Sequence, residues 1–309
     1  MDQTLLTLDR MRTFVRVAER GNLSAVAREF NIGQSTVTRH LRDLEEGLGV
    51  ALLSRTTRRV TLTEEGARFL DTSLRMLRIL EQGAEEARGS RDAPSGTIRI
   101  SCTAALGVRH VTRLVFAFQN RYPEIQVDLS LTDDRIDLVR DGIDLALRLG
   151  PLSDSSMKRR VLGYSRRLLV ASPAYLTAWG QPLTPSDLAG HQGIRMVNVG
   201  GSDHLILRGR DGKDQRVPFG GRLRLDHGLA AREAFAAGQG LGPTHRWLVD
   251  DLLQSGALLE VLPDYTLPPV PLSMLIVPQR AAITRIRLLV DYLVRESSSI
   301  PGLHHSPAW

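Results

Sequence analysis

The stretch NIGQSTVTRHLRDLEEGLG, Asn31 to Gly49, places a short turn in front of a run with one apolar face. The apolar residues follow one another at steps of four, three and four, which is the spacing of one face of an α-helix. They are Val37, Leu41, Leu44 and Leu48. Hydroxyls, amides and arginines fill the other positions. The pattern predicts an amphipathic helix, from about residue 34 to residue 46, whose second face is polar.

Two further helices are predicted before this one. Apolar residues recur at helical spacing from Asp9 to Arg20, and Gly21 follows where such a helix would end. A second, short helix is predicted from residue 25 to residue 30, with Ser24 as its N-cap. Two helices joined by a three-residue turn that contains glycine, the second of them amphipathic, form the helix-turn-helix pattern.

A hairpin and a long helix are predicted next. Two short apolar stretches, residues 50–53 and 60–62, bracket SRTTRR, so an arginine-bearing wing is expected there. Thr63 then caps a helix with Glu64 and Glu65 in its first turn, where the helix dipole favours acids. Its apolar stripe runs to about residue 88. A stripe of that length, without a neighbouring core in the sequence, predicts a partner, most simply the same helix of a second copy.

The pattern changes after a Gly-, Ser- and Pro-rich segment at residues 89–96. From residue 97 on, predicted strands alternate with helices of about a dozen residues, which predicts βαβ units and a mostly parallel sheet. A first set covers residues 97–149 and a second covers 168–262, and the apolar strand at 272–277 leads back to the first sheet. We therefore expect two α/β lobes joined by crossing strands, with a ligand cleft between them.

Composition narrows the class of protein. With 309 residues the chain is expected to form two or three compact units. Basic residues exceed acidic ones by 40 to 34, which permits an anionic partner without demanding one. The single cysteine, Cys102, excludes an internal disulfide and fits a reducing compartment. Since no run approaches 18 apolar residues, a cytoplasmic protein without membrane association is expected.

One long segment carries a family resemblance. The run MRTFVRVAERGNLSAVAREFNIGQSTVTRHLRDLEEGLGVALLSRTTRRVTLTEEG, residues 11–66, resembles the DNA-binding half of LysR-type transcriptional regulators. LVASPAYL (169–176), DGIDLALRLG (141–150) and AGQGLG (237–242) look like the effector-binding domain of that family. The resemblance covers residues 8 to about 296. It implies an α/β protein with a mainly α, winged helix-turn-helix N-terminus, a dimerising linker helix and two Rossmann-like lobes similar to periplasmic solute-binding proteins.

The resemblance and the pattern together suggest domain bounds. A winged helix-turn-helix is expected at residues 1–65, a linker helix at 66–89, a hinge at 90–96, an effector domain at 97–300 and a tail at 301–309. Within the effector domain, lobe 1 is expected at about 97–165 and 269–296, and lobe 2 at about 166–268. The implied assembly is a homodimer or homotetramer, and RNA polymerase is left open as a further partner.

The expected function is sequence-specific binding to double-stranded DNA, modulated by a small-molecule effector. Residues that match the family's DNA-contacting positions, together with the wing arginines, are Gln34, Ser35, Thr36, Thr38, Arg39, Arg55, Arg58 and Arg59. Arginine can pair with guanine and glutamine with adenine, so Arg39 and Gln34 are assigned to base edges. His40 stands where the family more often has glutamine, and we expect it to pack beside the recognition face. Because the arginine excess from residue 9 to residue 62 is only ten against six acids, two copies on an imperfect palindrome are expected.

The effector is expected where strands end and helices begin, because free amides and the helix dipole favour anions there. The candidate contacts are Ser101, Thr103, Thr132, Arg148, Ser202 and Thr244. A small organic or aromatic acid is the expected class of ligand. For each hydroxyl in the set, capping of a helix without any ligand is the competing interpretation.

Redox, metal-binding, cofactor-binding and enzymatic functions find little in the sequence. Cys102 is more simply a small buried hydrophobe than a redox switch, because a switch would use a pair of cysteines. The histidines have no metal-ligand spacing, and the glycines at 238, 240 and 242 do not follow the dinucleotide fingerprint, so neither a metal nor a cofactor is expected. No enzyme activity is predicted. The alternative is a small-molecule-binding protein or an enzyme that uses the two lobes and has no DNA-dependent role.

Overall fold

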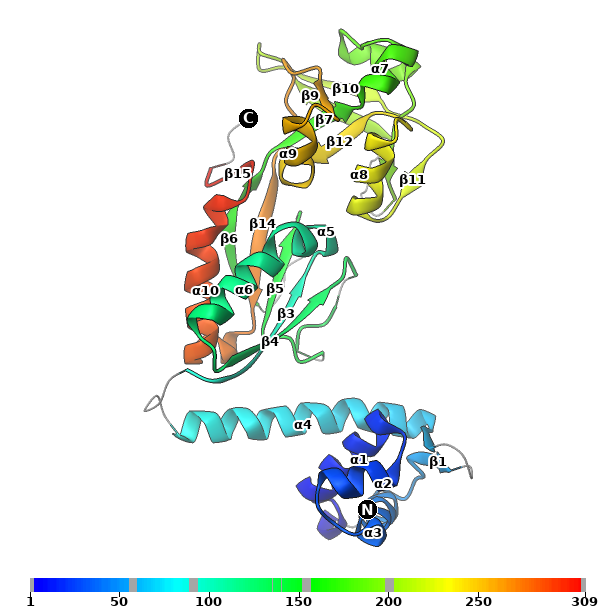
Figure 1. Ribbon diagram of the computed structural model, residues 1–309, viewed down its shortest axis with the longest axis vertical. Coiled ribbons are helices and arrows are strands. Elements are labelled where there is room, and N and C mark those ends of the chain that lie inside the picture. Colours follow the sequence, from blue (N-terminus) through cyan, green and yellow to red (C-terminus); the bar gives the residue numbers. More distant parts are fainter. Residues whose placement is uncertain are drawn as a thin grey trace. The chain divides into compact units, whose positions relative to one another are not determined.

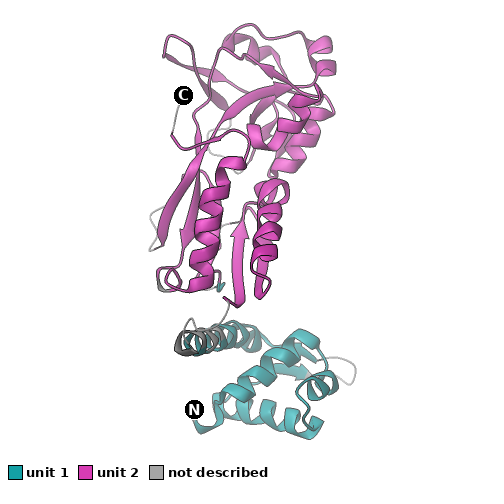
Figure 2. Cartoon of the chain, turned by 60° about the vertical axis from the view of Figure 1, so that its left-hand side comes forward, with its two compact units in different colours: residues 1–91, 140–142 teal, residues 92–139, 143–309 magenta. Residues whose placement is uncertain are grey.

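The computed structural model describes residues 3–55, 60–88, 94–134, 136–139, 141–151, 157–197 and 203–306. The chain divides into two compact units, residues 1–91 with 140–142 and residues 92–139 with 143–309 (Figures 1 and 2). Within the described residues, no helix has the length and apolar character needed to cross a membrane. The two units are considered separately below.

The first unit is built from four α-helices and a two-stranded hairpin in its described part. In chain order they are η1 (Gln3–Leu5), α1 (Leu8–Arg20), α2 (Leu23–Glu29), α3 (Gln34–Leu48), β1 (Leu53–Arg55), β2 (Val60–Leu62) and α4 (Glu64–Arg88). The strands pair antiparallel, with Leu53 opposite Leu62. Phe14 of α1, Val26 of α2 and Val37 of α3 are fully buried in one core, so the predicted helix-turn-helix is present, and the two strands predicted to flank the wing are paired.

The N-cap predicted for the second helix was wrong. Ser24 does not cap α2; the Asn22 side chain does, because it accepts a hydrogen bond from Ala25 N at 3.0 Å. The helix consequently begins at Leu23 instead of Ala25. Asparagine and serine are equally good caps, so local sequence did not decide between them. The Ser24 hydroxyl is left free for another role.

The apolar stripe of α4 is partly covered by its own unit. Leu70, Leu74 and Leu77 pack against the core of the first unit, which the sequence pattern did not predict. Met76, Ile79 and Leu80 of the same helix are exposed; Leu80 continues the stripe, whereas Met76 and Ile79 lie on another face. These exposed apolar residues, of which Leu80 belongs to the predicted stripe, are available to a second copy.

The second unit contains a six-stranded sheet in the order β15-β6-β14-β5-β3-β4. Its strands are β3 (Gly96–Cys102), β4 (Ile125–Leu131), β5 (Leu145–Leu149), β6 (Lys158–Ser165), β14 (Val270–Ile276) and β15 (Leu303–His304). The associated helices are α5 (Ala104–Leu106), the π-helix η2 (Gly107–Val111), α6 (Thr112–Arg121), η4 (Pro278–Arg280), α10 (Thr284–Glu296) and η5 (Ser297–Ser299). Strand β3 is parallel to β4 and β5, whereas β14 and β15 run antiparallel to their neighbours. The sheet is therefore mixed, because the returning strand β14 inserts between β5 and β6.

A smaller lobe is formed by the middle of the chain. Strand β7 (Arg167–Ala171) lies between β12 (Gly242–His245) and β13 (Leu259–Val261), antiparallel to both. Two pairs complete it: the hairpin β9 (His204–Arg208) with β10 (Asp214–Pro218), and the parallel pair β8 (Arg195–Met196) with β11 (Arg224–Leu225). Its helices are α7 (Pro173–Trp179), η3 (Pro185–Gly190), α8 (Gly228–Ala236) and α9 (Arg246–Gln254). Figure 1 shows β6 running from the larger sheet directly into β7 of this lobe.

The chain end is not only a tail, contrary to the bounds expected from sequence. Leu303 and His304 pair with Ser165 and Tyr164 of β6 and so form the edge of the larger sheet. Gly302 permits this turn because its φ is 71°, a left-handed conformation that favours glycine. The strand has only two residues, Leu303 and His304, which is too short for a periodic pattern, so the sequence could not predict it.

A buried hydrogen-bonded chain lies where the lobes join. Trp247 Nε1 donates to Ser165 Oγ at 3.0 Å, and Ser165 Oγ lies 2.7 Å from His245 Nδ1. Since tryptophan can only donate, the serine hydrogen is free to bind the unprotonated ring nitrogen. Burial lowers the pKa of His245 to about 3, and the charge of Arg167 lowers it further in the same direction. The junction therefore holds His245 neutral.

This neutral histidine predicts an acid-sensitive junction. Unfolded His245 titrates near its ordinary pKa of about 6.5. As the pH falls from about 6.5 toward 3, the unfolded chain binds a proton that the folded chain does not. The stabilisation is thus complete above the unfolded pKa and is lost on acidification, at up to about 1.4 kcal/mol per pH unit. Replacing His245 by asparagine removes the titration. Urea unfolding at pH 7, 6 and 5 should show the gap between wild type and His245→Asn narrowing; a gap that is constant over this range would contradict the assignment.

Candidate DNA interface and effector site

Helix α3 has one buried face and one free face. Its buried residues include Val37, Leu41 and Leu44, which are at most 1% exposed. Gln34, Ser35 and Arg39 are exposed, and the other two predicted DNA contacts on this helix, Thr36 and Thr38, are half-buried. Thr38 Oγ1 donates to the Gln34 carbonyl at 3.1 Å. The polar side chains thus lie on the N-terminal half of a helix whose apolar side is anchored.

Two acidic residues of α3 make contacts within the first unit. Asp43 pairs with Arg10 of α1 at 2.9 Å, and its side chain is only 13% exposed. Glu45 Oε1 accepts from the backbone amides of Leu52 and Leu53, at 2.8 and 3.1 Å, and so ties the helix to the start of the hairpin. The carboxylates of Asp43 and Glu45 are therefore engaged within the unit. They also fix the axis of α3 relative to α1 and the hairpin.

His40 packs beside the recognition face, as expected from the sequence. Its Nδ1 lies 2.9 Å from Thr13 Oγ1, and the Thr13 hydroxyl donates to the Asp9 carbonyl at 2.7 Å. Because the single hydroxyl hydrogen is committed to Asp9, Nδ1 of His40 must be the donor to Thr13. Burial is the main cause that lowers the pKa of His40, followed by the charges of Arg10 and Arg39. The ring is therefore a structural link between α3 and α1.

Three arginines were predicted for the wing. Arg58 and Arg59, and the side chain of Arg55, lie outside the described residues. The flanking strands β1 and β2 are paired, so the hairpin that presents this segment is present.

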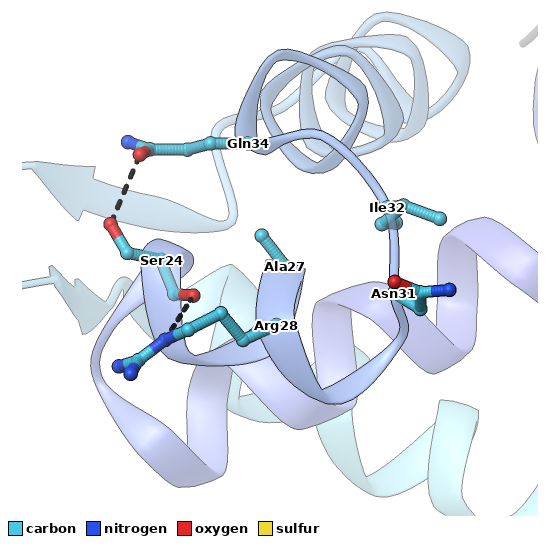
Figure 3. A pocket seen from close by; sticks show the side chains of 6 residues that line it. All are labelled: Ser24, Ala27, Arg28, Asn31, Ile32 and Gln34. Carbon is cyan, nitrogen blue, oxygen red and sulfur yellow. Dashed lines mark hydrogen bonds between the residues drawn. The ribbon is translucent and has the colours of Figure 1, made fainter.

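A hollow of about 470 Å³ opens at the N-terminal end of α3. It is lined by Ser24, Ala27, Arg28, Asn31, Ile32 and Gln34. Figure 3 shows Ser24 and Arg28 on the same side of it, with Gln34 opposite. Sequence reasoning had assigned Ser24 to capping and had passed over Arg28. The presence of two competing caps, Asn22 and Ser24, was the signal that one of them was free for another contact.

Four of the predicted effector residues come together at one edge of the larger sheet. They follow or end the adjacent parallel strands β3, β4 and β5, and they are Ser101, Thr103, Thr132 and Arg148. Ser101 is fully buried, and its Oγ accepts from Arg148 Nη2 at 2.7 Å. Burial lowers the pKa of Arg148, so this cation is partly stripped of water. Thr103 Oγ1 is buried, and the Cys102 thiol is the side chain that interacts with it in the described part of the chain.

The neighbouring loop limits what a ligand can find there. Asp133 Oδ1 accepts from Ala104 N, the first amide of α5, at 3.1 Å. That amide was expected to be open to a ligand carboxylate and is instead occupied by the protein's own. Thr132 Oγ1 is engaged with Asp134, donating to its carboxylate at 3.3 Å and accepting from its amide at 3.1 Å. Arg148 and the Thr103 hydroxyl are therefore the polar groups of this set best suited to meet an anion.

Of the other two predicted effector residues, Thr244 is described and does not join this group. Ser202 lies outside the described residues. Thr244 is buried on β12 opposite Leu168, and within the described part of the chain no hydrogen bond links it to Ser101 or Arg148. A separate hollow of about 310 Å³ is lined by Gln192, Gly193, Arg222, Leu223 and Gln239, none of which was predicted.

Cys102 has the character of a buried hydrophobe. It is free and fully buried, and burial raises the pKa of its thiol to about 12. A thiol with that pKa carries almost no reactive thiolate at neutral pH. Among the described residues, no group of three or more histidine, cysteine or acidic side chains could hold a metal ion.

The segment after β3 is pinned to the second lobe. Arg109 of η2 pairs with Asp251 of α9 at 2.8 Å, and Asp251 also receives both terminal nitrogens of Arg232 at 2.7 Å. Hydrogen bonds from Arg232, with the charges of Arg232 and Arg109, lower the pKa of Asp251 to about 2. His110 Nε2 lies 2.9 Å from the Trp247 carbonyl. A change at Ser101 to Thr103 thus lies a few residues from contacts that join the lobes.

Comparison with known proteins agrees with this geometry. Residues 8–67 match the family model described as a bacterial regulatory helix-turn-helix protein of the lysR family, and residues 91–298 match the LysR substrate binding domain. The chain belongs to the LysR family. It is a DNA-binding transcriptional regulator with a domain for a small-molecule effector, and not an enzyme. The alternative of a ligand-binding protein or enzyme without a DNA-dependent role finds no support.

Individual LysR-family relatives cover most of the chain. An HTH-type transcriptional regulator of Xanthomonas campestris pv. campestris is 35% identical over 285 residues, which are 91% of this chain and 83% of the relative. The structure of CrgA, a LysR-type transcriptional regulator from Neisseria meningitidis, is 30% identical and covers 93% of this chain and 98% of its own, with a TM-score of 0.61. The full-length structure of the Vibrio cholerae virulence activator AphB is 29% identical, with 94% and 99% covered and a TM-score of 0.63.

Proposed function

We propose that this LysR-family regulator reads an imperfect palindrome with the α3 helices of two copies and responds to a small organic or aromatic acid held at Arg148. The observation that carries the first part is the exposed polar row of α3, whose opposite face is anchored in the core. A helix placed in the major groove reads bases with residues near its N-terminus, and this is where the free polar row lies.

Individual roles follow from side-chain chemistry. Arg39 offers a planar fork to guanine, and Gln34 offers an amide to a base edge. Ser35, Thr36 and Thr38 reach phosphate or a thymine methyl. The wing arginines, Arg55, Arg58 and Arg59, add positive charge for phosphate or the minor groove.

Two copies are needed because one unit carries few contacts. The exposed Met76, Ile79 and Leu80 on α4 supply an apolar surface for a second α4. The assembly proposed is a homodimer or a homotetramer acting in the cytoplasm, with RNA polymerase as a further partner at the promoter.

The effector part rests on the partly desolvated guanidinium of Arg148 and on the buried Thr103 hydroxyl at the end of the neighbouring strand. Arg148 is partly buried and its Nη2 donates to the neutral Ser101 hydroxyl, so an anion would gain a charge-assisted hydrogen bond there. Thr103 Oγ1 lies at the end of the adjoining strand and could satisfy its hydrogen-bonding capacity on the same ligand. Binding at this point favours one arrangement of the lobes through the segment pinned by Asp251, and thereby alters the spacing of the paired DNA-reading helices.

A footprint tests the regulatory proposal directly. We expect protection of a roughly palindromic site in the DNA upstream of this gene and its divergent neighbour. Pools of small organic acids are expected to shift that protection. Absence of protection, together with no effect of any pool, would refute the proposal.

Arg39→Ala tests the base-reading role. The variant is expected to lose about 1 to 3 kcal/mol of binding free energy on the specific site and little on unrelated DNA. Titration by fluorescence anisotropy on both sequences measures this difference. Arg42→Ala is the matched control, because Arg42 lies one turn further along and is paired with Glu46 and Asp43. Equal weakening of Arg39→Ala on every sequence would place Arg39 on phosphate instead.

Arg148→Met tests the effector site. Loss of a charge-assisted hydrogen bond should raise the effector concentration needed for the DNA response by roughly tenfold or more. Binding to DNA without effector should change by less than about twofold, because Arg148 belongs to the second unit. Arg99→Met, which removes a surface pair with Asp128 on the same sheet, is the control. A normal response of Arg148→Met to the active acid would place the effector elsewhere, for example in the hollow beside Arg222.

A further inference from the structure

His40 is the only histidine in the sequence of the first unit, residues 1–91 with 140–142. Histidine is the side chain whose ordinary pKa lies closest to neutral pH. A change of charge on a side chain of this unit near neutral pH is therefore expected at this ring. It lies on the helix proposed to enter DNA, directly after Arg39.

The hydrogen bonds of His40 fix where a proton can bind. Thr13 Oγ1 lies 2.7 Å from the Asp9 carbonyl oxygen, and the hydroxyl must supply the hydrogen there because a carbonyl can only accept. The same hydroxyl oxygen lies 2.9 Å from His40 Nδ1, so it accepts from that nitrogen. The neutral ring consequently carries its hydrogen on Nδ1 and leaves Nε2 bare. A further proton goes to Nε2 and leaves the link to Thr13 intact.

The charges around the ring favour its neutral form in the free protein. Burial is the main cause that lowers the pKa of His40, and the charges of Arg10 and Arg39 lower it further. Asp9 of α1 and Asp43 of α3 act in the opposite direction and more weakly. The carboxylate of Asp43 is already paired with Arg10 at 2.9 Å. The short helix η1, which also packs against α3, carries no charged side chain.

DNA in contact with α3 would reverse this balance. Arg39 is exposed and is the residue proposed to reach a base edge, so the neighbouring ring lies close to the same groove. Duplex DNA carries one negative charge per about 1.7 Å of its axis, and a helix in the major groove has phosphates on both sides. Nearby negative charge favours the charged form of an imidazole. Binding should therefore raise the pKa of His40 from its lowered value.

We propose that His40 takes up a proton when α3 enters the major groove, so that acidification strengthens binding to the operator. The inference rests on the proposed DNA contact of α3 and makes the proton a second ligand beside the small-molecule effector. Linkage gives the sign: because the bound protein has the higher pKa, affinity rises as the pH falls through the bound pKa and levels off below the free pKa. A pKa that rises by about half a unit to one unit on binding gives a gain of roughly threefold to tenfold.

Affinities of the full chain for its operator test the inference. They are measured without effector by fluorescence anisotropy, from about pH 8 to about pH 5.5 at constant ionic strength. Over this range wild type should gain roughly threefold to tenfold more affinity than His40→Gln. Glutamine keeps an N–H donor for Thr13 but has no charge to gain. His305→Gln, the same replacement at an exposed histidine of the second unit, is the control and should keep the pH dependence of wild type.

Proton uptake can also be measured directly on wild type. Calorimetric titrations with operator DNA at about pH 6.5, in two buffers that differ in ionisation enthalpy, give the number of protons taken up on binding. We expect a fraction of one proton for each α3 bound, and a smaller number for His40→Gln. A merely structural role of the ring would change the affinity without changing this number.

Two results would overturn the inference while the DNA contact of α3 stands. One is an equal pH dependence of wild type and His40→Gln, and the other is specific binding by wild type without proton uptake. Loss of the pH dependence in His305→Gln would also overturn it, because the proton would then bind in the second unit. Absence of operator binding at every pH would instead refute the DNA contact itself, and the inference with it.

Discussion

Burial of the apolar face of α3 is the constraint on which the DNA-reading unit depends. Val37, Leu41 and Leu44 are buried in a core that α3 shares with α1 and α2. Each Å² of apolar surface removed from water contributes about 25 cal/mol. Because the helix repeats every 3.6 residues, fixing this face leaves Gln34, Ser35 and Arg39 no orientation except outward. The polar row is therefore presented by the core, and no contact of its own is needed to expose it.

Burial of apolar side chains also holds together the two lobes of the second unit. The buried core of the larger sheet continues through Leu168 and Val170 of β7 to Trp247 and Leu248 of α9, so the lobes share apolar contacts where the strands cross. The neutral chain from Trp247 through Ser165 to His245 satisfies the polar groups at this point without leaving a buried charge in the trio. Further along, the Arg109, Asp251 and Arg232 contacts are partly exposed. Apolar packing therefore fixes the junction. The ion pairs beside it are partly exposed, so water can take the place of one partner.

Periodicity in the sequence predicted the elements that local physics decides. The third helix was predicted at about 34–46 and extends from Gln34 to Leu48, where Gly49 ends it with a left-handed φ of 72°. Features that depend on contacts distant in sequence were not predictable in this way. Asp133 occupies the first amide of α5 from another loop, and Leu303 pairs with a strand more than a hundred residues earlier. Ser24 is the intermediate case: both roles were chemically open to it, and only its distance from Gln34 decides between them.

The same reasoning explains why few unpaired charges remain on the free face of α3. Of the charged side chains on α3, Asp43 and Glu45 serve the fold, and Arg42 is balanced by Glu46. Few groups on the helix therefore remain to attract DNA without regard to sequence. If α3 reads DNA as proposed, selectivity rests on Arg39 and on uncharged groups such as the Gln34 amide, because these can distinguish base edges. The hydrogen bond between Ser24 and Gln34 restricts this exposed side chain without adding charge to the free face.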